Sequence, residues 1–270
     1  MKIIVNADDF GMDENSSTAI LRCFREDLIT QTTLMVNMPW CDLAVSEARK
    51  VGCIDRIGLH INLSEGLPLT ETIKSCPHFC NDEGRFNGEI RRKLKYRFFL
   101  SRKERYAIEC EILAQMEKFI SLGLSMRHCD SHGHVCAYLS ILPIFLRCAK
   151  ACGFKSTRIW CNITGNHLGA PLTPAKKLYC RTVERLVRKS GLSKTDYLGY
   201  AWDLPRIPQT VCSDGVIEVL CHPNYRNENG EKDMVSGELK DWKTSYRDSI
   251  GAIPKTIERW TFSDLITRRT

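Results

Sequence analysis

Short apolar segments alternate with helical segments along most of the chain, and this alternation constrains the fold more than any other feature. Residues 2–6, 32–37 and 57–63 are apolar and rich in β-formers, whereas 14–25 and 41–50 carry apolar residues at helical spacing. The same analysis predicts further strands at 126–131, 157–160, 216–221 and 257–262, and further helices at 89–100, 103–122, 138–152, 174–189 and 238–250. Strands that alternate with helices form a mostly parallel sheet.

These units predict an α/β fold, namely a closed or nearly closed (β/α) barrel that is a modified, TIM-barrel-like architecture. The 270 residues suit one such barrel, because α/β barrels routinely reach this length. We expect a single domain over 1–270, since no linker or internal repeat divides the chain. Residues 64–88 and 161–173 interrupt the alternation, and we expect them to form long loop excursions at the C-terminal face.

The composition is that of a folded protein outside the membrane. The hydrophobic fraction of 43% is enough for a sizeable core and too high for a disordered chain. No run approaches the roughly 20 apolar residues of a membrane span, and the apolar run at 3–5 is too short for a secretory signal. We therefore expect a soluble, cytoplasmic protein with no membrane partner.

The chain is basic, with 39 Lys and Arg against 32 Asp and Glu. The densest basic stretch, 89–105, also carries apolar residues and predicts an amphipathic helix with a basic face. A solvated face is favoured over a nucleic-acid surface, because no nucleic-acid-binding motif accompanies the stretch. We expect no nucleic-acid partner.

Fourteen cysteines raise the question of disulfides or metal binding. Most lie inside hydrophobic segments, where a thiol behaves as a small apolar side chain, so the sequence predicts reduced cysteines. Cys76, His78 and Cys80 form a weak zinc-like pattern. No second pair with finger-like spacing follows it, which disfavours a zinc finger.

Polar side chains gather where the predicted strands end. Five of the seven histidines lie at such ends, and so do several carboxylates and amides. The C-terminal ends of parallel barrel strands converge on one face, where such folds place their chemistry. The sequence therefore predicts one site built from Asn6, Asp8, Asp9, Asn37, His60, Asn62, His128, Asp130, His132, His134, Arg158 and His222.

The adjacent pair Asp8 and Asp9 is the most informative part of this set. Two neighbouring carboxylates repel each other unless a cation compensates one of them. A metal held by one aspartate and two histidines keeps positions for water and substrate, as catalytic rather than structural sites do. The alternative function of the pair is to cap the helix at 14–25, although Asp13 or Ser17 can cap it instead.

At these residues the sequence resembles the YdjC-like carbohydrate deacetylase family, whose bacterial members include chitooligosaccharide deacetylases. The matching segments occur in the family's order and span nearly the whole chain. They are VNADDFG at 5–11, GLHINL at 58–63 with Gly66 and Pro68, HCDSHGH at 128–134, and EVLCHP at 218–223.

The resemblance implies a modified (β/α) barrel, a divalent metal that is commonly magnesium, a homodimer, and an acetylated amino-sugar substrate. By motif position Asp9, His60 and His132 match the metal ligands, Asp8 matches the catalytic carboxylate, and His222 stands where a second catalytic residue is expected. The family often has a further histidine where this chain has Cys136, so no function is carried over to that position.

Amide hydrolysis then assigns the expected chemistry. A metal-activated water attacks the acetyl carbonyl, Asp8 is the general base, and His222 is the general acid for the leaving amine. Arg158 either pairs with Asp8 and keeps it ionised or forms a salt bridge with another carboxylate. The remaining polar residues at the strand ends are expected to contact substrate or orient the ligands.

Several alternatives remain open at this level. Aspartate and histidine ligands suit zinc, iron or manganese, whereas the resemblance favours magnesium. A phosphoesterase acting on a sugar phosphate, or a non-catalytic carbohydrate-binding protein, would also use a polar barrel mouth. The aromatic segment 191–210, with Tyr197, Tyr200 and Trp202, either shapes the pocket or belongs to the core or a dimer contact.

Overall fold

The computed structural model describes residues 1–163, 171–200, 203, 214–225, 231–233 and 258–268. Its strands are β1 (Lys2–Phe10), β2 (Gln31–Leu34), β3 (Ile57–Ile61), β4 (His128–Ser131), β5 (Ser156–Thr157), β6 (Tyr197–Tyr200), β7 (Val216–Cys221), β8 (Pro223–Tyr225), β9 (Glu231–Asp233) and β10 (Glu258–Arg259). Its α-helices are α1 (Glu14–Arg25), α2 (Cys41–Val51), α3 (Glu71–Lys74), α4 (Glu89–Arg92), α5 (Arg102–Ser121), α6 (Leu142–Ala151), α7 (Pro174–Ser190) and α9 (Phe262–Thr267). Short 3₁₀ helices are η1 (Ile54–Arg56), η2 (Leu94–Arg97) and η3 (His132–Ala137).

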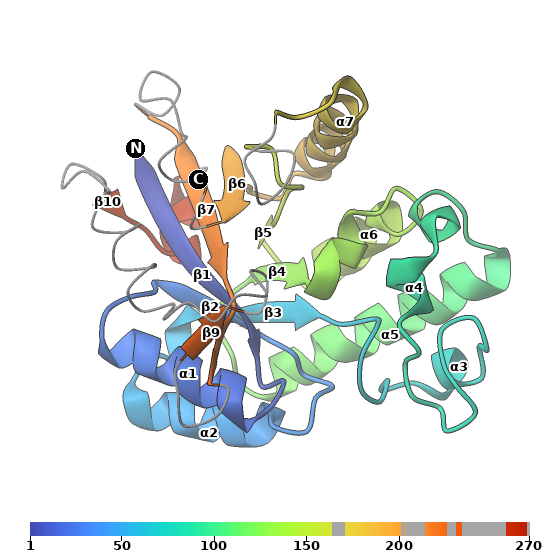
Figure 1. Ribbon diagram of the computed structural model, residues 1–270, viewed down its shortest axis with the longest axis horizontal. Helices are drawn as coiled ribbons and strands as arrows, with labels where there is room; N and C mark the ends of the chain where they lie inside the picture. The colour runs from blue at the N-terminus through green and yellow to red at the C-terminus, as the bar shows by residue number, and fades with distance from the viewer. Residues whose placement is uncertain (164–170, 201–202, 204–213, 226–230, 234–257, 269–270) are drawn as a thin grey trace.

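A parallel sheet in the order β5-β4-β3-β2-β1-β7-β6 forms the centre of the molecule. Its seven strands curl into a half-barrel, which confirms the expected modified barrel (Figure 1). A parallel bridge between Ser156 and Ser193 links the β5 edge to the segment that leads into β6. β10 adds a short parallel pairing to the start of β1.

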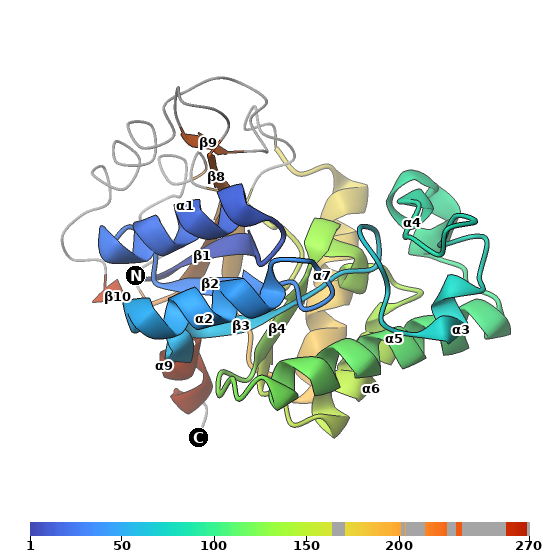
Figure 2. The same ribbon diagram turned by 90° about the horizontal axis from the view of Figure 1, so that it is seen from below.

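Helices cover the outer face of this sheet. Figure 2 shows α1 and α2 side by side over β1 and β2, while α5 and α6 cover the part near β3 and β4. The excursion 64–88, which contains α3, lies with α4 at the opposite end of the molecule from α1 in both views. Its backbone is anchored to α5, because Glu111 accepts hydrogen bonds from the N–H groups of Leu69 and Thr70.

Strand alternation separates an apolar outer face from a polar inner face. On β7 the odd-numbered side chains Ile217 and Val219 enter the main hydrophobic cluster, whereas Val216 belongs to a separate small cluster. Because successive strand residues point to opposite faces, Glu218 shares the inner face with Val216. The other strands follow the same rule, so Asn6, Asp8, His60, His128 and Asp130 share this inner face.

A small apolar plug closes the inner face below these polar groups. It consists of Ile4, Met126, Val216, Phe262 and Leu265, with α9 supplying the last two. The Phe262 ring stacks on the imidazole of His128, with centroids 3.4 Å apart. The plug therefore packs against the polar site through the contact between Phe262 and His128.

The structure corrects several predicted boundaries. β1 continues beyond the predicted range 2–6 as far as Phe10, and η3 follows β4 directly. The helix expected at 89–100 is wrong as a single element, since α4 ends before Lys93 and η2 follows. The strand expected at 257–262 ends at Arg259, because a capping box at Thr261 starts α9. β6 was not predicted at all.

The helices at 14–25 and 41–50 and the strand at 216–221 are confirmed almost to the residue. The helix predicted at 238–250 lies outside the described residues. Within the described part of the chain, no helix has the length and apolar character needed to cross a membrane. Every cysteine in that part is a free thiol.

The plug predicts that Phe262→Ala destabilises the protein by about 3–5 kcal/mol, because a fully buried ring leaves a cavity under the site. Chemical denaturation of the variant measures the loss. Phe99→Ala is the matched control, since that ring is 75% exposed. Equal stability of the two variants would contradict the assigned function of the plug.

Candidate metal centre and active site

The end of β1 places two carboxylates on one side of the sheet. Its pairing with β2 slips between Ala7 and Phe10, and Asp9 has a positive φ of 69°. An irregularity of this kind redirects side chains that would otherwise alternate between faces. Asp8 and Asp9 therefore both approach Nε2 of His60, at 3.9 and 3.2 Å.

Neither carboxylate caps the helix that follows. Asp13 is the N-cap residue of α1 and accepts a hydrogen bond from the backbone N–H of Ser16. The capping alternative for the aspartate pair is therefore wrong. Both carboxylates remain available to the site.

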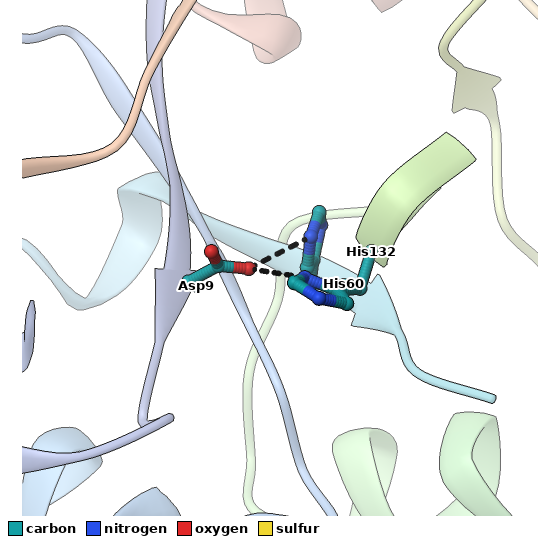
Figure 3. Close-up of side chains that lie close together, drawn as sticks. All are labelled: Asp9, His60 and His132. Carbon is teal, nitrogen blue, oxygen red and sulfur yellow. Dashed lines mark hydrogen bonds and ion pairs between the residues drawn. The ribbon is translucent and has the colours of Figure 1, made fainter. Parts of the chain in front are cut away.

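Asp9, His60 and His132 converge from β1, β3 and η3 (Figure 3). Oδ1 of Asp9 lies 3.2 Å from Nε2 of His60 and 2.8 Å from Nδ1 of His132. All three residues are buried. The structure thus brings together the three side chains that the sequence singled out as ligands.

The charge balance of this group favours cations. Burial lowers the pKa of both histidines, but the carboxylates outweigh it: Asp130 and Asp8 raise the pKa of His60 to about 10, and Asp9 raises that of His132 to about 9. Burial raises the pKa of Asp9, yet contact with His132 holds it well below its usual range. The carboxylates around the two histidines therefore favour positive charge at this group.

The donor atoms also have the spacing of a metal site. Ligands about 2.1 Å from a zinc or magnesium ion lie roughly 3 Å from their neighbours, which agrees with the contacts that Oδ1 of Asp9 makes. Two further acidic groups have donor atoms equally close together, Asp8–His60–Asp130 and His128–Asp130–Glu218. Both contain carboxylates already paired with a guanidinium, which would repel a cation. The Asp9 group is therefore the better metal site.

A carboxylate stands behind His60 and fixes its orientation. Nδ1 of His60 lies 2.6 Å from Oδ1 of Asp130 and 3.1 Å from the hydroxyl of Thr33. This leaves Nε2 facing Asp9. Ligand histidines commonly have such a partner on the second nitrogen, so Asp130 lies where the sequence placed a ligand-orienting residue.

Arg158 lies at the centre of the buried charges. Nη1 and Nη2 donate to the two carboxylate oxygens of Asp8, each at 2.7 Å. Nη2 also lies 2.6 Å from Asp130, and Nε donates to Glu218 at 2.8 Å. Both sequence alternatives for Arg158 are realised together: it pairs with Asp8 and with other carboxylates.

Arg158 keeps Asp8 charged. Burial raises the pKa of Asp8. The charges of Arg158 and His60 lower it by more than burial raises it, so the pKa lies below its ordinary value. Asn6 adds a hydrogen bond from its Nδ2 to Oδ1 of Asp8 at 2.7 Å. Asp8 is therefore an ionised and fixed carboxylate beside the metal group.

Glu218 was part of a quoted sequence segment but was assigned no function there. Burial raises the pKa of Glu218 to about 7, although Arg158 opposes this shift. Its Oε2 and the Nε2 of His128 are both buried and have no hydrogen-bond partner among the residues that the structure describes. Glu218 orients the guanidinium from its Nε side, so that the opposite end faces Asp8.

His222 follows β7 and approaches the same carboxylate from the other side. Its Nε2 lies 3.8 Å from Oδ2 of Asp8, and its side chain is 16% exposed. It is therefore more accessible than the Asp9 group. Asp8 stands between His60 and His222.

The other predicted histidines lie farther from the metal group. His128 is fully buried between Ser156 and Phe262 at the floor of the site. His134 packs against Trp160, and burial together with Arg158 lowers its pKa to about 3. Cys136 is buried, and burial raises the pKa of its thiol, which therefore stays protonated.

Asn37 and Asn62 hold the excursion rather than the metal group. Asn62 accepts from the N–H of Glu65 and donates to its carbonyl at 2.7 Å. Asn37 donates to the same carbonyl at 3.1 Å. Both strand-end amides therefore fix the backbone of one residue, Glu65.

Glu65 and Arg91 are site residues that the sequence analysis missed. Oε1 of Glu65 lies 3.0 Å from Nε2 of His132 and 3.1 Å from Nη1 of Arg91. The only sequence signal was the position of Glu65 in the first turn of the excursion. Nothing in the spacing indicated Arg91, which approaches from α4.

An open cavity of about 650 Å³ adjoins these two residues. Its lining is mostly polar, with Glu65, Asn87, Arg91 and Arg92 beside glycines and Phe86. The volume lies within the range of small-molecule sites. Glu65 and Arg91 connect this cavity to His132, because both contact Nε2 of that histidine.

The weak zinc pattern is not assembled. Cys76 and Cys80 are buried, whereas His78 points to Glu104, with Nδ1 2.8 Å from Oε1. None of the three belongs to a group with metal-ligand spacing in the described part of the chain. The segment 191–210 supplies β6, and Trp202 lies outside the described residues.

Residues 2–251 match the family described as YdjC-like protein. The chain belongs to this family. The resemblance drawn from the four sequence segments is thereby confirmed, and in this YdjC-like protein the segments provide the strand ends that meet at the site.

Relatives and a solved structure agree over most of the chain. A carbohydrate deacetylase of Halalkalibacterium halodurans is 28% identical over 256 residues, which cover 90% of this chain and 94% of that protein. A carbohydrate deacetylase of Vibrio parahaemolyticus is 30% identical over 230 residues, with coverages of 84% and 80%. A putative cellobiose-phosphate cleavage protein from Enterococcus faecalis shares the fold, with a TM-score of 0.73 at 21% identity over 98% of both chains.

The geometry predicts that Asp9→Asn and His132→Ala each abolish binding of a divalent metal, because each removes a central donor. Elemental analysis of protein purified without chelators measures metal content. His78→Ala is the control, since that side chain is 58% exposed and lies outside the group. Retention of wild-type metal content by Asp9→Asn would refute the assignment.

The raised pKa of Glu218 predicts a pH-dependent stability difference. A carboxyl whose folded pKa exceeds its unfolded value stabilises the fold below the unfolded pKa and loses that contribution as pH rises. For Glu218 the window runs from its ordinary 4.5 to about 7. The glutamine of Glu218→Gln cannot ionise, so this variant does not lose stability as the pH rises. Its free energy of unfolding relative to wild type should therefore rise by on the order of 3 kcal/mol across that window.

Thermal unfolding of the two metal-free proteins at a series of pH values from 4.5 to 8 measures this difference. A constant difference across the series would mean that Glu218 is ionised throughout.

Proposed function

We propose that this protein is a metal-dependent hydrolase that removes the N-acetyl group from an acetylated amino sugar or short chitooligosaccharide. The observation that carries the proposal is the Asp9–His60–His132 group beside the ionised Asp8. Membership of the YdjC-like family, with relatives named carbohydrate deacetylase, supports the substrate class. Simple sugar binding does not require two adjacent buried carboxylates, Asp8 and Asp9, whereas metal-dependent hydrolysis uses one as a ligand and the other as a base.

Asp9, His60 and His132 would hold the metal. A bound divalent ion supplies Lewis-acid chemistry, because it acidifies a water and polarises a carbonyl oxygen. The donor set of one oxygen and two nitrogens suits zinc or manganese, whereas magnesium, which the family resemblance implies, prefers oxygen donors. The elemental analysis described above distinguishes them.

Asp8 is the proposed general base and His222 the proposed general acid. The fork of Arg158 keeps Asp8 ionised and aims its carboxylate, so it can accept a proton from the attacking water. Nε2 of His222 then donates a proton to the departing sugar amine. Nε2 of His222 and Oδ2 of Asp8 are 3.8 Å apart, beyond direct hydrogen-bond distance, so the proton returns from Asp8 to His222 after turnover through one bridging water.

The cavity lined by Glu65 and Arg91 is the proposed sugar site. Glu65, Asn87 and Arg91 offer hydrogen-bond partners for sugar hydroxyls. Trp160, which packs against Tyr138 and Tyr179, offers an aromatic surface at the start of the second excursion. The homodimer and the cytoplasmic location stay predictions from the sequence.

Acetate release tests the proposal. We expect metal-loaded protein to release acetate from N-acetylated mono-, di- or oligosaccharides, with inorganic phosphate measured in parallel on acetylated sugar phosphates. Asp8→Asn and His222→Ala should each lose about 10²–10⁴-fold in rate while His222→Ala keeps its metal.

His78→Ala should retain wild-type turnover, because His78 contacts none of the proposed groups. Phosphate release without acetate would instead identify a phosphoesterase. Binding of an acetylated sugar with neither product, at full metal occupancy, would identify a carbohydrate-binding protein. An unchanged rate in His222→Ala would move the general acid elsewhere.

A further inference from the structure

His132 reaches the metal group with one nitrogen and the excursion with the other. Nδ1 lies 2.8 Å from Oδ1 of Asp9, so this nitrogen faces the group. Nε2 points the opposite way and lies 3.0 Å from Oε1 of Glu65. A neutral imidazole carries its proton on only one nitrogen. As a ligand through Nδ1, His132 must carry that proton on Nε2, facing Glu65.

We propose that Glu65 is a positioning residue of the metal centre, which accepts the Nε2 proton of His132 and thereby fixes the tautomer and ring orientation of that ligand. The inference rests on the metal centre of the proposed function. It gives the two histidines matching partners: Asp130 behind Nδ1 of His60 and Glu65 behind Nε2 of His132. Such carboxylate partners strengthen metal binding by orienting the ligand and raising its basicity.

The backbone of Glu65 is held rigidly enough for this function. Its N–H donates to Asn62, and its carbonyl accepts from Asn62 and Asn37. The next residue, Gly66, has a φ of 72°, and a Cβ there would lie 2.7 Å from the sulfur of Met38. The strand-end asparagines therefore position a carboxylate from outside the barrel.

Arg91 completes the arrangement from α4. Its Nη1 donates to Oε1 of Glu65 at 3.1 Å. Gly133 has no side chain to obstruct this approach, since a Cβ there would lie 2.6 Å from Nε of Arg91. Nη1 of Arg91 also lies 3.0 Å from Nε2 of His132. When Nδ1 is the ligand atom the ring proton is on Nε2, so this nitrogen donates to Glu65 and cannot accept from Arg91.

The test is metal affinity rather than activity. Calorimetric titration of metal-free protein with Mn²⁺ or Zn²⁺ compares wild type with Glu65→Gln and Glu65→Leu. The leucine variant removes the acceptor and should weaken the Kd by about 10–100-fold. The glutamine variant keeps a neutral acceptor for the Nε2 proton and should lose less.

Glu89→Gln and Glu89→Leu are matched controls. Glu89 is a neighbouring carboxylate that pairs with Arg92 and Lys93 instead of a histidine, so both variants should keep the wild-type Kd. The melting temperature of metal-free Glu65→Leu should fall by no more than about 4 °C, because its carboxylate is partly exposed.

A wild-type Kd in Glu65→Leu, or an equal loss in Glu89→Leu, would overturn the proposal. Failure of the proposed function has a different signature, namely wild-type protein that binds no metal or releases no acetate. The two failures are therefore distinguishable in the same titration and assay.

Discussion

The guanidinium of Arg158 is the interaction on which the rest of the site depends. Asp8, Asp130 and Glu218 are buried on the inner face of the half-barrel, where unpaired carboxylates would be strongly destabilising. Arg158 lies within 2.7 Å of all three. Removing it would take from three buried carboxylates the cation that they share, whereas the pairing allows an acidic interior to exist above the apolar plug.

Because Arg158 occupies Asp8 and Asp130, the metal group is left to Asp9. One fixed cation thus separates Asp8 and Asp130, which it pairs with, from Asp9, the proposed metal ligand. His60 links the carboxylates paired with Arg158 to the metal group, since it contacts Asp130 through Nδ1 and Asp9 through Nε2. His132 extends the chain of contacts outward to Glu65 and Arg91.

Much of the fold was predictable, because strands buried on both faces read as apolar runs and parallel strands place their ends together. β7 and α1 are confirmed, since β7 is a strongly apolar run and α1 begins after the Asp13 cap. α9 was missed because Phe262 follows a β-rich run, although Thr261 and Asp264 form a capping box that is a local sequence signal for a helix start. The break at Lys93 is likewise invisible to a periodicity that continues through it.

The sequence by itself determined that carboxylates and imidazoles share one end of a parallel sheet, because period-two alternation and strand direction are local properties. The choice of Asp9, His60 and His132 came from the family resemblance, because strict alternation would turn Asp9 away from Asp8 and only the irregularity at the end of β1 brings both carboxylates to His60. Only the tertiary structure decided which carboxylate each cation neutralises and that Glu65 stands behind His132. These pairings join residues far apart in the chain, such as Asp8 with Arg158, and their distances depend on packing that no sequence spacing specifies.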